Sequence, residues 1–369
     1  MNANTAPAPY NFIYADSDTA AAYYETYLSV VPGASVTLKG QYPQARYFSY
    51  FIYEGVTSIL AHAVDYQIAP DAGSQSPFVS AQNVVSESAG TVNTYTLTIT
   101  FSAQPASPAP NTLYVDPSVA GSSVLIVYRV YNSFTSNLLG GVPLPAFSGT
   151  SANPFTCGFW AFGINVLPPL VNYLDNASAT WQIPVAAEPR FALAYKTQNV
   201  VSVIENEDNQ FAYTNNSLAN HDMILVRFKA PTYATEPGAA QPVNVRHWSV
   251  CQSSLTSTHM WGCTEDSAAT VDANGFVNIV VSKTQVTAPG FNWLLYGPST
   301  LQTGELIYRQ QLPAANFAGS FANVPSGQNP TEVIGAYFPL ATYCSNSVFT
   351  ANSGSGIDPA VTFAACTGS

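Results

Sequence analysis

Two stretches of this chain are diverged copies of one another, and this repeat constrains the fold more than any other feature of the sequence. Six of the ten basic residues stand at matching places: Lys39, Arg46 and Arg129 in the first copy, and Lys229, Arg246 and Arg309 in the second. Asp65 and Asp71 likewise match Asp266 and Asp272. Each copy then continues with an alternating segment, TYTLTITFS in the first and GFVNIVVSK in the second. The repeat predicts two structural units built in the same way.

Both copies have the pattern of β-strands. Apolar and polar residues alternate with a period of two, and the segments are rich in Tyr, Phe, Val, Ile and Thr. The clearest predicted strands are 45–53, 95–101, 124–131 and 223–228. Turn clusters at 70–73 and 105–108 separate neighbouring strands. We therefore predict an all-β protein with two tandem, diverged β-sandwich domains of jelly-roll type.

Two segments outside the repeat have a helical pattern. The segment SDTAAAYYETY, residues 17–27, predicts a short helix that Ser17 or Asp18 caps and that carries Glu25 on its exposed side. Residues 164–174 predict a helix or a packed linker. The expected organisation is an N-terminal helical segment at 1–34, a first sandwich at 35–150, a partly helical linker at 151–190, and a second sandwich with a C-terminal tail at 191–369.

The composition favours an exported protein. Charged residues make up only 8% of the chain, whereas roughly 25% is usual for a soluble domain. The net charge of −11 provides no basic surface for nucleic acid. The most apolar run, 155–171, is interrupted by glycines and a Pro-Pro pair, so no membrane span is predicted. The Pro- and Ala-rich start resembles a secreted mature chain behind an added methionine, and we expect a secreted or periplasmic location.

The five cysteines are consistent with that location. Cys251 and Cys263 flank one polar turn, and Cys344 and Cys366 flank another near the C-terminus, so we predict two local disulfides. Cys157 remains and is expected to be a buried thiol. Neither the cysteines nor the histidines have metal-site spacing, so we expect neither a metal nor a cofactor.

Four motifs resemble those of uncharacterised bacterial envelope or secreted proteins that carry a β-sandwich domain of unknown function. The motifs are GxYPxARY at 40–47, IAPDxGS at 68–74, NTLY at 111–114 and VYRVY at 127–131. The similarity is good over the first copy and weaker over the second. It implies a β-sandwich fold and an exported location, and it implies no active site.

The matched arginines and aspartates have two interpretations. An arginine inside an aromatic strand is costly to bury unless a carboxylate or carbonyl groups accept its hydrogen bonds. The structural interpretation pairs Arg46 with Asp65 or Asp71, and Arg246 with Asp266 or Asp272, as one network in each copy. In the functional interpretation, the networks line a cleft in which the arginines bind a carboxylate or another oxyanion.

Further candidates stand where the copies differ. His247 replaces Tyr47 of the first copy and is, with Asp71 and Asp272, a candidate catalytic residue, although another amphipathic side chain is the simpler interpretation. The candidate ligand-binding residues are Arg46, Arg129, Arg246, Arg309, Trp248, His259 and Trp261. The acidic segment ENEDNQ, residues 205–210, lacks the spacing of a calcium loop and is expected to be solvated.

Three classes of function follow from these features. The leading hypothesis is an exported protein that binds a small apolar or carbohydrate ligand in an aromatic-rich cleft between the two domains. The second is a lyase, isomerase or hydrolase that uses Arg and Asp residues with His247 or a tyrosine as acid–base groups. The third is a structural subunit of a filament, shell or capsid, and homo-oligomers are compatible with the sequence.

Overall fold

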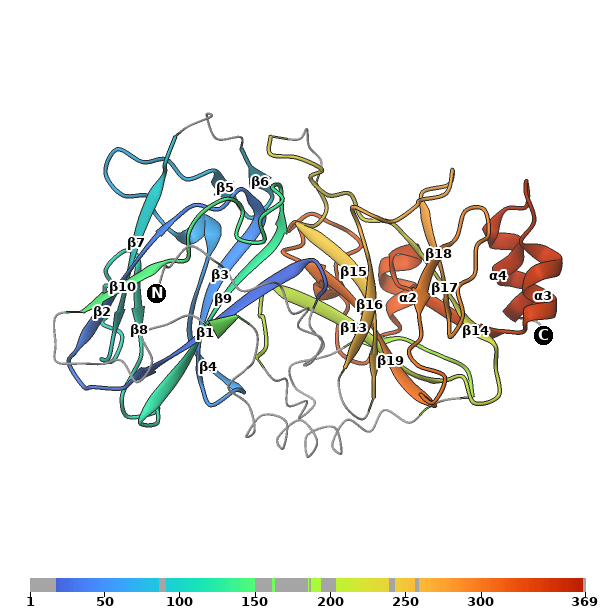
Figure 1. Cartoon of the computed structure of the whole chain (residues 1–369), viewed down its shortest axis with the longest axis horizontal. Helices are drawn as coiled ribbons and strands as arrows, with labels where there is room; N and C mark the ends of the chain where they lie inside the picture. Colours follow the sequence, from blue (N-terminus) through green and yellow to red (C-terminus); the bar gives the residue numbers. More distant parts are fainter. Residues whose placement is uncertain are drawn as a thin grey trace.

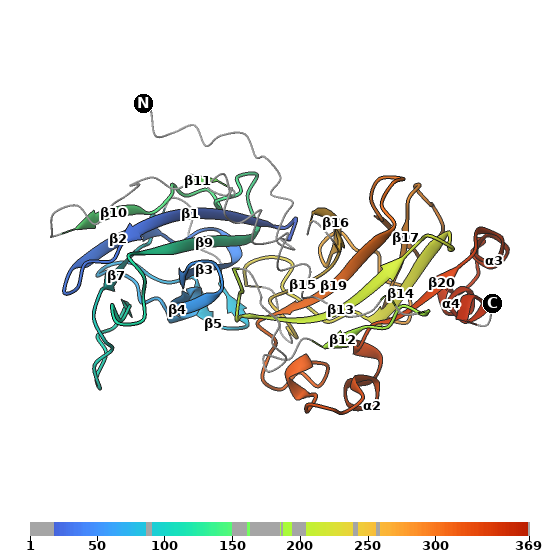
Figure 2. The same cartoon turned by 90° about the horizontal axis from the view of Figure 1, so that it is seen from below.

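The computed structural model describes residues 18–85, 91–149, 161–162, 185, 187–193, 204–238, 243–255 and 259–367. These residues form mainly β-strands in several sheets, and this confirms the all-β prediction at that level. The predicted helix at 164–174, Cys157 and most of the predicted linker lie outside the described residues. Figures 1 and 2 show two lobes side by side, each with its own pair of sheets.

The first lobe contains a five-stranded and a four-stranded sheet. The five-stranded sheet has the order β11 (Ala161–Phe162), β1 (Ala21–Ser29), β9 (Ser123–Ser133), β3 (Ala45–Glu54) and β4 (Ser58–Val64). The four-stranded sheet has the order β10 (Ala146–Gly149), β2 (Ser35–Gln41), β7 (Thr94–Thr100) and β8 (Thr112–Tyr114). The 3-10 turn η1 (Asp65–Gln67) follows β4, and β5 (Phe78–Ser80) pairs with β6 (Asn83–Val84).

The second lobe repeats this strand order. Its five-stranded sheet has the order β12 (Ala192–Leu193), β13 (Asn209–Ser217), β19 (Thr303–Gln311), β15 (His247–Ser254) and β16 (Met260–Glu265). Its four-stranded sheet has the order β18 (Asn292–Leu295), β17 (Phe276–Ser282), β14 (Met223–Lys229) and β20 (Leu340–Cys344). In each lobe the pairing of the last two matched strands, β7 with β8 and β17 with β18, is parallel, whereas the other pairings in these sheets are antiparallel.

The C-terminal part adds short helices to the second lobe. They are η2 (Phe321–Asn323), α2 (Pro330–Ile334), η3 (Gly335–Tyr337), α3 (Asn346–Asn352) and α4 (Pro359–Thr367). The predicted tail therefore covers the second sheet pair, and α3 and α4 lie at its far end (Figure 1). Both predicted disulfides are present: Cys251–Cys263 joins directly opposed residues of β15 and β16, and Cys344–Cys366 joins β20 to α4.

Each pair of sheets encloses its own apolar core. In the first lobe Tyr24, Phe48 and Tyr128 of the five-stranded sheet pack against Leu97 and Ile99 of the four-stranded sheet. Strand β7 illustrates the period of two, because its Tyr and aliphatic residues are buried and its threonines are half-buried. In the second lobe, Trp248 on β15 is buried in the core, as Phe48 on β3 is in the first lobe.

The predicted helix at residues 17–27 is wrong, because residues 21–27 belong to strand β1; Ser17 lies outside the described residues. Asp18 does accept a hydrogen bond from the backbone N–H of Ala20 at 2.9 Å, which is the local contact expected of a capping residue. The chain then pairs with β9 along all nine residues of β1. Ala22, Tyr24 and Leu28 alternate into the core, so burial with a period of two overrides the local capping signal.

Candidate functional site

Four of the matched residues, Arg46, Arg246, Asp65 and Asp266, meet where the two lobes contact each other, and we call this contact the junction. Nη1 of Arg46 donates to Oδ1 of Asp266 at 2.8 Å. In the opposite direction, Arg246 donates to both carboxylate oxygens of Asp65, from Nη1 at 3.0 Å and from Nη2 at 3.3 Å. The pairs are exchanged: each arginine binds the aspartate of the other copy. The expected networks within one copy are therefore wrong.

Backbone hydrogen bonds explain why the partners are exchanged. Oδ2 of Asp65 accepts the N–H of Phe48, and Oδ2 of Asp266 accepts the N–H of Trp248, both at 3.1 Å. Each aspartate is thereby fixed to a strand of its own lobe. The arginine of each copy instead reaches across the junction, where its partner is buried with it. Buried charges persist when they are paired in this way.

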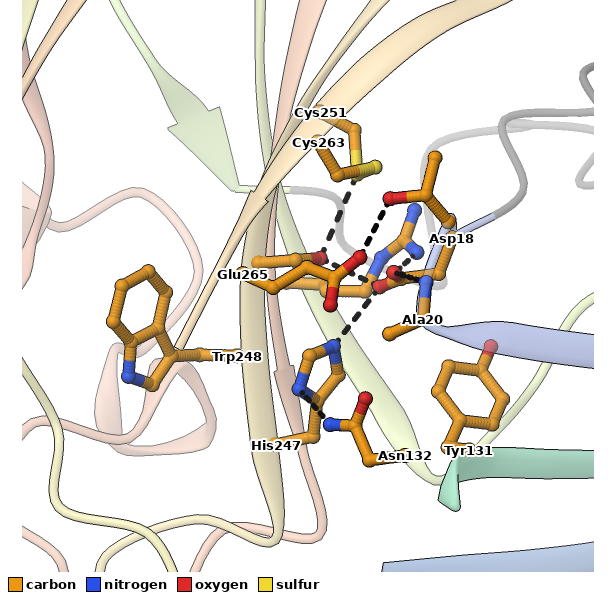
Figure 3. Close-up of polar contacts among 12 residues, drawn as sticks. Asp18, Ala20, Tyr131, Asn132, His247, Trp248, Cys251, Cys263 and Glu265 are labelled. Carbon is orange, nitrogen blue, oxygen red and sulfur yellow. Dashed lines mark hydrogen bonds and ion pairs between the residues drawn. A yellow bond between two sulfur atoms is a disulfide. The ribbon is translucent and has the colours of Figure 1, made fainter. Parts of the chain in front are cut away.

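His247 lies at the centre of the junction (Figure 3). Its Nδ1 lies 3.0 Å from Oδ2 of Asp266, and its Nε2 lies 3.1 Å from Oδ2 of Asp18. The same oxygen of Asp18 accepts hydrogen bonds from Ser249 at 2.6 Å and is 2.6 Å from Nη1 of Arg309. The histidine, both carboxylates and the arginine are all buried.

This environment makes His247 a structural cation. Burial alone lowers the pKa of His247, but the charges and hydrogen bonds of Asp266 and Asp18 outweigh burial and raise that pKa to about 9. A pKa of about 9 favours the protonated imidazole at neutral pH. Its Nε2 faces Asp18, and its Nδ1 faces Asp266 and lies 2.8 Å from Nδ2 of Asn132 (Figure 3). A general base needs a free lone pair within reach of a substrate. His247 is 0% exposed and both of its ring nitrogens are engaged by Asp18, Asp266 and Asn132, so its geometry does not support the catalytic role considered for it.

The first copy makes a matching contact at Tyr47. Its hydroxyl donates to Oδ2 of Asp208 at 2.6 Å, and the hydroxyl of Tyr53 donates to the backbone oxygen of Glu205. Burial raises the pKa of Asp208 above its usual range. The acidic segment is therefore not the fully solvated loop that the sequence predicts, because it packs against the first lobe. Among its acidic residues Glu207 is exposed, whereas Glu205 and Asp208 are half-buried.

Arg129 differs from the other three matched arginines because no carboxylate forms an ion pair with it among the described residues. Its Nη2 donates to the hydroxyl of Tyr53 and to the backbone oxygen of Ile204, both at 2.7 Å. Aromatic rings surround the guanidinium carbon, which lies 4.9 Å from the ring centre of Phe51 and 5.9 Å from that of Tyr23. Nη1 of Arg129 is buried and has no hydrogen-bond partner in the part of the chain that the structure describes.

Glu25 is the functional candidate that the sequence analysis missed. The residue is 2% exposed on β1, not on the exposed side of a helix. Burial raises its pKa to about 7, and the nearby charge of Arg129 opposes this shift only in part. Oε2 of Glu25 has no hydrogen-bond partner among the described residues. The signal in the sequence was the period-two pattern of AAYYETYLS, which places Glu25 on the same strand face as Tyr23 and Tyr27.

Glu25 and Arg129 share one face of the five-stranded sheet, on the side away from the core of the first lobe. In the β1–β9 ladder, Tyr23 is opposite Arg129 and Glu25 is opposite Val127, so Glu25 and Arg129 are diagonal neighbours. The rest of this face is aromatic and aliphatic, with Tyr23, Tyr27, Phe51, Tyr53, Leu125 and Val127 packed together. We call this surface the Glu25–Arg129 face.

The other candidates lie elsewhere. Trp248 is in the core of the second lobe, and its Nε1 donates to the backbone oxygen of Pro231 at 3.2 Å. His259 and Trp261 are half-buried neighbours on and next to β16, with ring centres 4.1 Å apart. Asp71 accepts a hydrogen bond from Thr94, and Asp272 pairs with Arg227 at 2.9 Å, each within its own lobe. The structure therefore does not bring Asp71 and Asp272 together with His247.

One group of residues has the ligand types of a metal site. Asp18, Cys251 and Cys263 place possible ligand atoms within 4.8 Å of one another among the described residues. The two sulfur atoms are joined in the disulfide, and Asp18 is bound to Arg309, Ser249 and His247. These contacts already use the groups that a metal would need. Figure 3 shows the disulfide beside this cluster.

The comparisons with known proteins relate this chain to others by fold. No protein-family model matches it, and no curated protein matches it. The solved structure of an uncharacterized protein from Burkholderia cenocepacia matches with a TM-score of 0.55 and 13% identity, over 90% of this chain and 78% of that one. A protein from Vibrio parahaemolyticus matches with a TM-score of 0.43 and 11% identity, over 92% of each chain.

At such low identity the first similarity describes the fold alone, and the second is too weak to support an argument. The described residues contain no helix that is long and apolar enough to cross a membrane. The two disulfides suggest an oxidising, extracytoplasmic compartment, because disulfides persist in such compartments. The chain therefore shares a β-rich fold with the Burkholderia cenocepacia protein.

Proposed function

We propose that this chain is an exported protein that binds a small ligand on the Glu25–Arg129 face. One observation carries the proposal: a buried carboxyl and a buried guanidinium lie on one sheet face, and each has a polar atom without a hydrogen-bond partner among the residues that the structure describes. In folded proteins about nine in ten buried polar groups are hydrogen-bonded, and exceptions often mark functional positions. A few polar groups placed among aromatic side chains are typical of ligand sites.

The chemistry of this face favours a carbohydrate or a small apolar molecule that carries hydroxyl groups. A hydroxyl group both donates and accepts, so one can donate to Oε2 of Glu25 and another can accept from Nη1 of Arg129. The half-buried rings of Tyr23 and Tyr27 provide apolar contact for the body of such a ligand. The proposed site is on the first lobe. The functional interpretation of the matched networks placed arginines in a cleft, but the hydrogen bonds of the junction arginines are directed to aspartates.

The fold proposal that accompanies this function is that the two lobes are tandem, diverged copies of one jelly-roll-like sandwich. Matched strand orders support it, as do matched details within the lobes. Asn111 exchanges hydrogen bonds with the backbone of Ala69, and its counterpart Asn292 does the same with Thr270. A shared origin explains why these local contacts recur at matching positions.

A second candidate function is acid–base catalysis at the same face. The pKa of Glu25, about 7, is close to the pH at which most enzymes operate. Such a value suits a group that both takes up and releases a proton during a reaction. Glu25 replaces His247 as the acid–base group in this version of the enzyme hypothesis. Turnover of a bound ligand by the wild-type protein distinguishes catalysis from binding alone, because Glu25→Gln is expected to lose both.

The test is a thermal-shift screen of sugars, sugar acids and hydroxylated apolar molecules. We expect at least one class to stabilise the protein, and we expect Arg129→Met and Glu25→Gln to abolish that stabilisation. Arg190→Met and Glu188→Gln are matched controls, because both residues are exposed in the described part of the chain, and these variants should keep it. Absence of stabilisation across the screen, or stabilisation that persists in both site variants, would overturn the proposal.

A further inference from the structure

The junction has a twofold pattern that the proposed ligand site does not use. In the contact between two identical subunits related by a twofold axis, residue i contacts residue j of the partner, and residue j contacts residue i. The exchanged pairs follow this rule, because Arg46 binds Asp266 while their counterparts Arg246 and Asp65 bind each other. Each lobe thus contributes one arginine and one aspartate to the junction, and each binds the opposite group of the other lobe.

Aromatic contacts follow the same rule. The guanidinium carbon of Arg46 lies 4.6 Å from the ring centre of Tyr233, which belongs to the second lobe. That of Arg246 lies 5.8 Å from the ring centre of Phe78, which belongs to the first. Each arginine is therefore held between a carboxylate and an aromatic ring of the other lobe. Such contacts add to ion pairing when the cation is desolvated.

The third reciprocal contact involves the residues that follow the arginines. Tyr47 binds Asp208, directly before β13, and its counterpart His247 binds Asp18, shortly before β1. The chemistry has diverged from a neutral hydroxyl to a cation, but the geometry is kept. In both directions the start of β3 or β15 in one lobe reaches a carboxylate that precedes the second strand of the other lobe's five-stranded sheet, β13 or β1.

We infer that the junction is a dimer-type interface in which each lobe is built to receive a second sandwich of the same kind. The partner is defined by its chemistry. It carries an arginine and an aspartate at twofold-related positions, an aromatic ring that contacts the arginine of the first lobe, and a carboxylate just before the second strand of its five-stranded sheet. Buried ion pairs fix one arrangement because any other leaves charges without partners. Association of the lobes is therefore a property of their surfaces, and it does not depend on the covalent connection.

This inference rests on the two-copy part of the proposed function and not on ligand binding. The experiment inserts a protease recognition sequence, flanked by Gly-Ser spacers, after Asn176 in the full chain. The folded protein is cleaved, cleavage is verified by two bands on a denaturing gel, and the product is analysed by size-exclusion chromatography with light scattering. We expect the two fragments to elute together with the mass of one intact chain.

Variants identify which contacts hold the fragments together. Asp65→Asn with Asp266→Asn should raise the dissociation constant of the cleaved pair at least tenfold. The control is Asp71→Asn with Asp272→Asn, which changes the other matched aspartates, whose partners lie within their own lobes. This control should leave the dissociation constant unchanged. Separate elution of the wild-type fragments would overturn the inference whatever the variants do, and so would equal weakening by the two double variants.

Discussion

Replacing Asp266 with asparagine tests the exchange of partners across the junction energetically. The substitution removes one negative charge that faces both Arg46 and His247, while an amide oxygen can still accept the backbone N–H of Trp248. All of these groups are buried. The change is therefore nearly isosteric, and its effect on the free energy of unfolding reports the lost charge rather than lost packing.

The expected magnitude follows from the burial. Removing one partner of a buried ion pair leaves an uncompensated charge and costs about 3–5 kcal/mol. Here two cations lose a partner, but Asp18 still neutralises His247, so we expect a loss within this range and not above it. Arg46→Met alone should cost a similar amount, because it leaves Asp266 facing only His247. In the double variant both losses overlap, which predicts a coupling energy of about 2 kcal/mol.

Urea unfolding of the full chain measures these energies. Three of the five tryptophans, Trp248, Trp261 and Trp293, lie in the second lobe, so their fluorescence reports on that lobe, and circular dichroism reports on both lobes. Asp71→Asn provides the control, since the sequence made Asp71 an equal candidate as the partner of Arg46. A coupling of Arg46 to Asp71, or additive losses for Arg46→Met and Asp266→Asn, would refute the exchanged pairing.

Three further predictions concern other groups. His247 has a pKa of about 9 in the folded state and 6.5 in the unfolded state. Its contribution of about 3 kcal/mol to the free energy of unfolding is therefore complete below pH 6.5 and is lost as the pH rises through 9. In His247→Gln the free energy of unfolding should no longer fall over this pH range. Glu25 has a pKa of about 7 in the folded state and 4.5 in the unfolded state. Its contribution to the free energy of unfolding is therefore complete below pH 4.5, and about 3 kcal/mol is lost as the pH rises through 7. Glu25→Gln should remove this pH dependence and should be more stable than the wild type at about pH 8. Cys344→Ser should lower the free energy of unfolding by about 3 kcal/mol, and addition of a reductant should no longer change the melting temperature through this disulfide.

The strands and the repeat could be predicted because their signals are local or periodic. Alternation within TYTLTIT is sufficient to place β7, and matched residues along the two copies anticipate matched strand orders. Both disulfides followed from short spacing around polar turns. Strand β1 was mispredicted because Asp18 and the alanines favour a helix locally, whereas pairing with β9 is a long-range contact that sequence propensity does not report.

The pairing of charges could not be predicted for a different reason. Spacing identified the correct arginines and aspartates, but two copies offer each arginine two equivalent aspartates, and the sequence does not say which copy supplies the partner. The contact between Arg46 and Asp266 spans 220 positions of the chain. Glu25 was missed because a carboxyl group is expected on the surface. Its burial depends on the assembled sheet face and not on its neighbours in the sequence.

Isothermal titration calorimetry with the best ligand from the screen tests most directly whether the ligand contacts Glu25 and Arg129. Trp261→Ala is the comparison, because Trp261 is a half-buried aromatic candidate on the other lobe. We predict that Glu25→Gln weakens binding at least tenfold and that Trp261→Ala binds like the wild type. Loss of binding in Trp261→Ala with unchanged affinity in Glu25→Gln would contradict the proposed site.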